Sequence, residues 1–268
     1  MTANIEFEGL YNVRDLGGMR TRDGRAVRSG LLLRGDQPFE ATENDKRKIV
    51  ELGVRTLIDF RSLTEHEEKP DPTIPGVRNV YLPIIEDVRA GITRGKKGDK
   101  ALMKMLAEGH DISPSFVDEH MGGMYRLFVE DDFANTQYAA FIDVVLEQAE
   151  AGGATLWHCT AGKDRAGFAT VTLLEALGVP RDDVVADYLR TNESLVHVVE
   201  KLMAMFGSHL PSDNARESLR RFFLADENYL AAAYAAADER YGSFEAFLAE
   251  ALHVDDAKRA KLQELLLA

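Results

Sequence analysis

The sequence predicts an α/β fold, with a central, mostly parallel sheet flanked by helices and a C-terminal helical extension or lid. Short apolar segments alternate with helical ones early in the chain, and almost wholly helical segments follow Asn192. The chain has 268 residues, of which 45% are hydrophobic and 29% charged, as in ordinary globular proteins. We expect a single domain over 1–268, in which 193–268 forms the extension.

Four short segments rich in Val, Leu or Ile predict strands at 26–33, 54–60, 77–82 and 154–158. Each segment is bounded by turn or charged residues. The second and fourth segments are apolar enough to be central strands that are covered on both faces.

Helix signals occupy most of the remaining chain. Thr42 is a predicted N-cap, and glycines mark the ends of several helices. The predicted helices are 42–52, 133–151, 165–177, 180–190, 193–206, 212–224, 226–241, 243–251 and 255–267. The polar stretch 91–100 predicts a mobile loop.

Composition limits the classes of function. A net charge of −13 disfavours nucleic-acid binding, which requires cations that neutralise phosphates. No apolar run approaches the roughly 18 residues that suggest membrane insertion, and residues 1–8 lack the pattern of a signal peptide. A cytoplasmic location is the default expectation, and secretion without such a peptide stays open. Cys159 is the only cysteine, so no disulfide framework and no cysteine-rich metal site is expected.

The strongest chemical signal is a loop between a predicted strand and a predicted helix, with the sequence His158-Cys159-Thr160-Ala161-Gly162-Lys163-Asp164-Arg165. Backbone N–H groups and the helix dipole favour an anion at such a helix N-terminus. The same field favours the thiolate of Cys159, and Arg165 can bind two phosphate oxygens. A lone cysteine is more often a small buried hydrophobe, but the surrounding pattern favours a nucleophile here.

The loop and its neighbours resemble one protein family. Four further segments, 12–18, 30–35, 57–62 and 184–192, occur in the same order as in bacterial tyrosine and lipid phosphatases of the protein tyrosine phosphatase superfamily. The resemblance runs from about residue 10 to residue 200. It implies a phosphatase-like fold without a cofactor, inorganic phosphate in the active site, and phosphorylated protein or phosphoinositide substrates. It also implies a possible two-helix lid over 212–241.

The resemblance assigns catalytic roles to three residues. Cys159 is implied as the nucleophile that forms a cysteinyl-phosphate, Arg165 as the phosphate clamp and Asp164 as the general acid. Glu86 and Asp87 are alternative acids, and Asp164 could instead hold the loop by a structural hydrogen bond. The mechanism needs no metal, because the loop and Arg165 supply the positive field.

Other residues of the loop have implied binding or supporting roles. Lys163 accompanies phosphoinositide activity in similar phosphatases, although an exposed lysine without substrate preference is an equal alternative. The implied phosphate-binding positions are Thr160, Ala161, Gly162, Lys163, Ala166 and Gly167. The implied supporting residues are His158, Arg14, Asp15 and Asp59, and some of these could be simple ion pairs of the fold.

One position departs from the family pattern. Relatives usually carry Ser or Thr after the arginine, whose hydroxyl stabilises the departing thiolate, but this chain has Ala166. We therefore expect slow breakdown of the phosphoenzyme. A phosphate-binding pseudophosphatase and a rhodanese-like sulfurtransferase are the rival functions.

Overall fold

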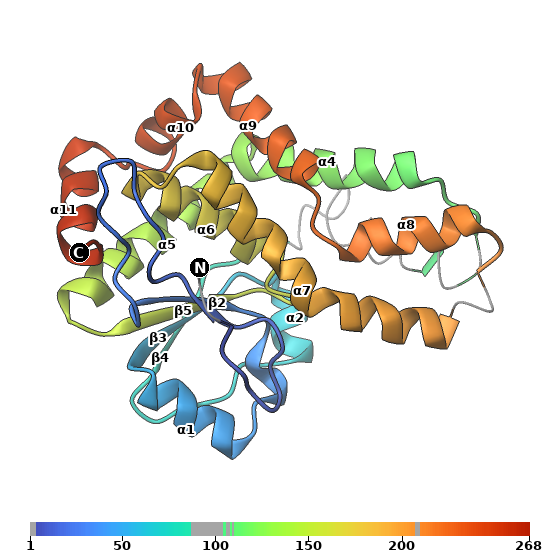
Figure 1. Ribbon diagram of the computed structural model, residues 1–268, viewed down its shortest axis with the longest axis horizontal. Helices are drawn as coiled ribbons and strands as arrows, with labels where there is room; N and C mark the ends of the chain where they lie inside the picture. The colour runs from blue at the N-terminus through green and yellow to red at the C-terminus, as the bar shows by residue number, and fades with distance from the viewer. Residues whose placement is uncertain (1–3, 87–103, 106–107, 109, 207–209) are drawn as a thin grey trace.

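The computed structural model describes residues 4–86, 104–105, 108, 110–206 and 210–268 (Figure 1). Its centre is a five-stranded sheet with the order β1-β2-β5-β3-β4. The strands are β1 (Arg14–Asp15), β2 (Leu32–Gly35), β3 (Val54–Asp59), β4 (Arg78–Tyr81) and β5 (Ala154–His158). Only β1 pairs in antiparallel fashion, and the pairs β2–β5, β5–β3 and β3–β4 are parallel. The predicted fold class is confirmed.

The strand predictions differ from the structure mainly at the first segment. The prediction 26–33 was wrong in its position, because the strand is Leu32–Gly35, whereas Ala26 and Val27 form only isolated bridges. Gly30 has a φ of 78°, and this left-handed turn interrupts the apolar run. The two-residue strand β1 was not predicted, since it is too short to show a pattern.

Helices cover both faces of the sheet. Those before the loop that follows β5 are α1 (Glu43–Glu51), α2 (Leu63–Glu68), α4 (Pro114–Glu130) and α5 (Asp132–Glu150), together with the short 3-10 helix Pro38–Glu40. Those after it are α6 (Arg165–Leu177), α7 (Arg181–Phe206), α8 (Asp213–Phe223), α9 (Glu227–Tyr241), α10 (Phe244–Glu250) and α11 (Asp256–Leu266). Helices α2 and α4 were not predicted. Helix α7 is continuous where two segments were expected, because no glycine or proline separates them.

The central strands divide their side chains between two cores, as alternation along a strand requires. Ile58 and Trp157 belong to the larger core, whereas their neighbours Leu57 and Leu156 belong to the smaller one. Helices α5 and α6 cover the face of the sheet with the larger core, and α1 contacts β3 on the face with the smaller core. This arrangement places β5 in the middle of the sheet, so its carboxyl end emerges at the centre of the molecule (Figure 1).

The C-terminal helices pack mainly on α4, α5 and α6. Helices α8 and α9 both contact α4, and α8 also contacts α7 (Figure 1). Helix α9 buries Tyr229, Leu230, Ala233 and Tyr234. The segment 212–241 therefore corresponds to α8 and α9, and its role as a lid stays a prediction. The predicted loop 91–100 lies outside the described residues.

Candidate active site

The loop from Cys159 to Asp164 joins the end of β5 to the start of α6. Gly162 has a φ of 69°, and a Cβ atom there would lie 2.5 Å from the carbonyl oxygen of Gly35. A residue other than glycine therefore fits neither the backbone conformation nor the space. The side chain of Asp164, the N-cap residue of α6, makes no capping hydrogen bond. The N–H groups of the first turn of α6 are therefore not capped by this carboxylate.

Cys159 follows the last residue of the central strand and is 2% exposed. The strands β2 and β3 lie on either side of β5, so the cysteine starts the loop at the carboxyl end of a parallel sheet. Ligands of open α/β sheets usually bind at this end.

Arg165 is held by Glu65, a residue of α2 that the sequence reading did not single out. Nη1 and Nη2 of Arg165 donate to the two oxygens of Glu65 at 2.7 and 3.1 Å. A third bond runs from Nη2 to the hydroxyl of Thr160 at 3.3 Å. The hydrogen bonds of Arg165 to described residues all use the two terminal nitrogens, so the Nε–H group can donate to an anion.

The ion pair keeps both groups charged. Burial by itself raises the pKa of Glu65, but the Arg165 guanidinium and hydrogen bonds from Ser62 and Thr160 hold that pKa well below its usual range. Burial by itself lowers the pKa of Arg165, and the Glu65 carboxylate more than offsets this and raises it. Glu65 also accepts the backbone N–H of Ser62 at 3.0 Å, which completes a capping box at the start of α2.

A second set of buried charges supports the backbone of the loop. Arg14 Nε donates to Asp187 Oδ1 at 2.9 Å, and Arg34 Nη1 donates to Asp187 Oδ2 at 3.1 Å. Arg34 Nη2 then donates to the carbonyl oxygens of Gly162 and Lys163, at 2.7 and 3.4 Å. Arg14 was predicted as a supporting residue. The structure connects it to the loop through Asp187, which it shares with Arg34.

The side chain of Asn12 holds a neighbouring carbonyl group. Its Nδ2 donates to the oxygen of Ala161 at 2.8 Å, and its Oδ1 accepts from Arg14 Nη1 at 3.2 Å. In a trans peptide the N–H points away from the C=O. Because the carbonyl oxygens of 161, 162 and 163 are held by Asn12 and Arg34, the N–H groups of Gly162, Lys163 and Asp164 are turned toward the opposite side.

His158 and Asp59 belong to a third buried cluster, behind the start of the loop. His158 Nε2 lies 2.9 Å from Asp71 Oδ2, and Arg61 Nη2 donates to Asp71 at 2.6 Å and to Asp59 at 2.8 Å. Burial by itself lowers the pKa of His158, but Asp71 and Asp59 raise it above its ordinary value. Burial raises the pKa of Asp59, which His158 and Arg61 bring down to about 2.

Asp59, Asp71 and His158 lie close enough together to be considered as metal ligands. The guanidinium of Arg61 already ion-pairs with both carboxylates and is fully buried between them. These residues therefore form an ion-pair network with Arg61 that holds His158 in place. Nδ1 of His158 lies 3.2 Å from the carbonyl oxygen of Cys159.

Asp164 and Lys163 make their contacts on the helical side of the loop. Asp164 Oδ1 accepts a hydrogen bond from the hydroxyl of Tyr125 at 2.9 Å and lies 3.4 Å from Lys163 Nζ. Lys163 is 3% exposed, and its Nζ donates to the carbonyl oxygens of Phe222 and Leu224, at 2.7 and 3.3 Å. Its charge therefore lies at the C-terminal end of α8, where carbonyl groups lack helical partners.

The remaining predicted residues are placed as follows. Ala166 and Gly167 are buried in the first turn of α6, and a Cβ atom on Gly167 would lie 3.1 Å from Arg34 Nη2. Asp15 is not part of the loop environment, since its oxygens accept the N–H groups of Gly17 and Gly30 at 2.9 and 2.7 Å. Asp87, an alternative acid, lies outside the described residues, and Glu86 lies at their edge.

Sequence reasoning singled out neither Glu65 nor Asp71 and gave Arg34, Asn12 and Asp187 no individual roles. One signal for Glu65 was available, because Ser62-x-x-Glu65 is the pattern of a capping box. It would have predicted the start of α2, but not the contact with Arg165.

Comparisons with known proteins identify the family of the chain. A profile of the tyrosine phosphatase family matches residues 5–268. A protein of Cupriavidus necator, provisionally named a tyrosine-protein phosphatase, is 33% identical over 256 residues, which cover 95% of this chain and 86% of the relative. The triple specificity protein phosphatase PtpB of Mycobacterium tuberculosis is 30% identical over 266 residues, which cover 92% of this chain and 93% of the relative.

Within the described part of the chain, no helix has the length and apolar character needed to cross a membrane. The resemblance read from the loop and its flanking segments is confirmed by the match over nearly the whole chain. The chain belongs to the tyrosine phosphatase family, and it is a protein tyrosine phosphatase.

Proposed function

We propose that the chain hydrolyses phosphotyrosine, and also phosphoserine, phosphothreonine or phosphoinositide monoesters, through a cysteinyl-phosphate on Cys159. The carrying observation is the orientation of the loop. Its carbonyl groups accept hydrogen bonds from Asn12 and Arg34, so three N–H groups point to the opposite side, where they could donate to a phosphate. The breadth of the substrate list rests on the similarity to PtpB, whose name describes a triple specificity.

In this mechanism the Cys159 thiolate attacks phosphorus, so that a P–S bond forms while the P–O bond to the leaving group breaks. Arg165 and the loop amides bind the equatorial oxygens. Asp164 donates a proton to the departing oxygen, whose parent phenol has a pKa near 10. Water then attacks phosphorus, gives a proton to Asp164 and breaks the P–S bond.

Hydrolysis of the P–S bond is the step that we expect to be slow. The hydroxyl of Thr160 donates its one proton to Glu65 at 2.8 Å, and Ala166 has no hydroxyl to offer. Rapid mixing with para-nitrophenyl phosphate should give a burst of nitrophenol close to one equivalent. A linear time course without trapped phosphocysteine would contradict this expectation.

Turnover is tested with para-nitrophenyl phosphate, and Cys159→Ser serves as the matched blank. Turnover that is lost in this variant, together with phosphate trapped on Cys159 of the unmodified chain by rapid denaturation, supports the proposal. Phosphate binding without turnover would instead identify a pseudophosphatase, and cyanide-dependent consumption of thiosulfate would identify a sulfurtransferase.

A panel of phosphotyrosine, phosphoserine and phosphothreonine peptides and phosphoinositide vesicles then ranks the substrates. Lys163 bears on the lipid part of the proposal. To act as a further cation for an inositol phosphate, its ammonium group would have to leave the carbonyl oxygens of Phe222 and Leu224.

A further inference from the structure

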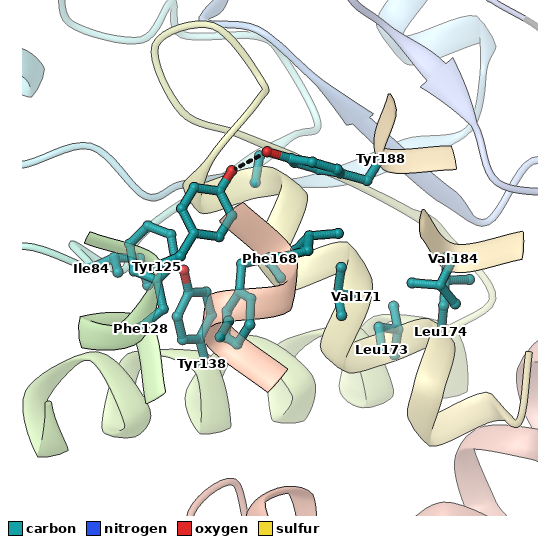
Figure 2. Close-up of a cluster of buried hydrophobic side chains, with 14 of the residues drawn as sticks. Ile84, Tyr125, Phe128, Tyr138, Phe168, Val171, Leu173, Leu174, Val184 and Tyr188 are labelled. Carbon is teal, nitrogen blue, oxygen red and sulfur yellow. Dashed lines mark hydrogen bonds between the residues drawn. The ribbon is translucent and has the colours of Figure 1, made fainter. Parts of the chain in front are cut away.

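Two buried tyrosines meet beside Asp164, from helices that are far apart in the sequence. Tyr125 comes from α4 and Tyr188 from α7, and neither side chain is exposed. Their hydroxyl oxygens lie 2.7 Å apart, as the dashed line in Figure 2 shows. The hydroxyl of Tyr125 also lies 2.9 Å from Asp164 Oδ1.

The direction of these hydrogen bonds follows from the number of protons. A phenol has one proton to donate, and Oδ1 of Asp164 accepts it both when the carboxyl group is ionised and when its proton is on Oδ2. If Tyr125 donates its proton to Asp164, the bond between the tyrosines must be donated by Tyr188. The three groups therefore form a chain from Tyr188 to Tyr125 to Asp164 Oδ1.

Both phenols stay protonated over the working range of pH. Burial, then the nearby Asp164 carboxylate, raises the pKa of Tyr125 and of Tyr188 well above that of a free tyrosine. A neutral phenol is an uncharged donor, so the two side chains can stabilise charge on Asp164 without bringing a charge of their own.

Packing fixes the positions of both rings. The rings of Tyr125 and Tyr188 meet edge to face, with centroids 6.1 Å apart, and Phe128 lies 5.1 Å from Tyr125 (Figure 2). A Cβ atom on Gly167 would lie 3.2 Å from the ring of Tyr188, so a glycine in the first turn of α6 admits this ring.

We propose that Tyr125 and Tyr188 are positioning residues for Asp164 as the general acid. Tyr125 occupies Oδ1, so the proton that is transferred resides on Oδ2. When the P–O bond breaks, that proton moves to the leaving oxygen, and the negative charge left on Asp164 is stabilised through the Tyr125 hydroxyl. Tyr188 strengthens this donor by polarising it. The inference rests on the proposed acid role of Asp164.

The test is the dependence of kcat/KM on the leaving group, measured with aryl phosphates whose phenols have pKa values from about 5 to 10. This ratio reports the steps through phosphoryl transfer, so slow breakdown of the phosphoenzyme does not mask it. In Tyr125→Phe we expect a loss of about 10- to 100-fold for the poorest leaving group and less than about threefold for the best. Tyr188→Phe should show the same trend with a smaller amplitude.

The matched control is Tyr234→Phe, which removes a buried phenol that donates to Glu175 at 3.0 Å in another part of the molecule. It should leave kcat/KM unchanged for every substrate. Melting temperatures of all variants show whether a loss of activity accompanies unfolding.

The double variant Asp164→Asn with Tyr125→Phe completes a mutant cycle. If the tyrosine acts through Asp164, its removal should have no further effect on the leaving-group dependence once Asp164 is replaced. Suppose that Tyr125→Phe lowers kcat/KM equally for all substrates, while Asp164→Asn lowers it most for the poorest leaving groups. This result would overturn the positioning role of Tyr125 and leave the acid role of Asp164 intact. No dependence in Asp164→Asn would overturn the acid role and with it this inference.

Discussion

Two arginine–carboxylate pairs contact the loop from Cys159 to Arg165, and they differ in which groups of the arginine they occupy. The Arg34–Asp187 pair is 1% and 2% exposed and donates to loop carbonyl groups. The Arg165–Glu65 pair is 12% and 21% exposed and uses only the terminal nitrogens of the arginine. The first pair fixes the backbone, whereas the second orients a side chain whose remaining edge can meet phosphate.

The two carboxylates, Asp187 and Glu65, differ in what their removal should cost. Buried ion pairs contribute little net stability, because desolvation offsets the attraction, but removal of one partner is costly. Asp187 is shared by Arg14 and Arg34, so its loss would leave two buried cations without their carboxylate. Glu65 is closer to solvent, so its loss should act on phosphate binding more than on folding.

The largest effect is expected from Asp187→Ala. It should lower the free energy of unfolding by about 3–5 kcal/mol, because Arg14 and Arg34 stay buried without a counter-charge. Urea unfolding followed by circular dichroism measures this loss. Asp132→Ala is the control, since the exposed pair of Asp132 with Arg240 should contribute no more than about 1 kcal/mol. Equal losses in the two variants would show that the buried pair has no special role.

A smaller effect is expected from Glu65→Gln, which removes the charge but retains the capacity to cap α2. We expect kcat/KM for para-nitrophenyl phosphate to fall about 100-fold, because Arg165 is no longer held in one orientation. Unfolding free energy should change by no more than about 1 kcal/mol. Glu67→Gln on the same short helix is the control. A large loss of stability with unchanged kinetics would reverse the roles assigned to the two pairs.

The cluster behind Cys159 predicts a pH dependence of stability. Because folding raises the pKa of His158, its contribution is complete below about pH 6.5 and is lost as the pH rises through the folded-state value. Unfolding free energy should therefore decline above pH 6.5, by at most about 1.4 kcal/mol per pH unit from this group. The decline should be absent in His158→Gln, and an unchanged slope there would assign it to another group.

Folding shifts the pKa of Asp59 in the opposite direction to that of His158. Its pKa of about 2 lies below that of an unfolded aspartate, so its contribution is present above about pH 4 and is lost as the pH falls through about 2. Between these two limits the cluster should hold His158 firmly.

The smallest effect is expected from Lys163→Met, which keeps the apolar stem but removes the ammonium group from the end of α8. Unfolding free energy should fall by about 1 kcal/mol, and amide hydrogens of α8 should exchange faster while those of β5 do not change. Lys46→Met, at an exposed pair with Glu43, is the control. Unchanged exchange in α8 would show that Lys163 does not anchor this helix.

Sequence patterns predicted the regular elements better than the contacts among them. Strand β5 and helix α6 were predicted with the bounds that the structure shows, because Gly152-Gly153, Gly162 and Gly178 mark their limits. Helix α4 was not predicted, although it carries Tyr125. Its stretch contains Gly122 and Gly123, which weaken the helical pattern, and packing against α8 and α9 stabilises the helix in the fold.

The sequence by itself determined the loop from Cys159 to Arg165, because a strand end, a glycine turn and a helix start are all encoded within a few neighbouring residues. Only the tertiary structure decided the partners of that loop. Glu65 lies 100 residues from Arg165, Asp187 lies 153 from Arg34, and Tyr125 lies 39 from Asp164. Local sequence reports backbone preference, whereas pairs at such separations depend on how the sheet and helices pack, and no spacing rule encodes that packing.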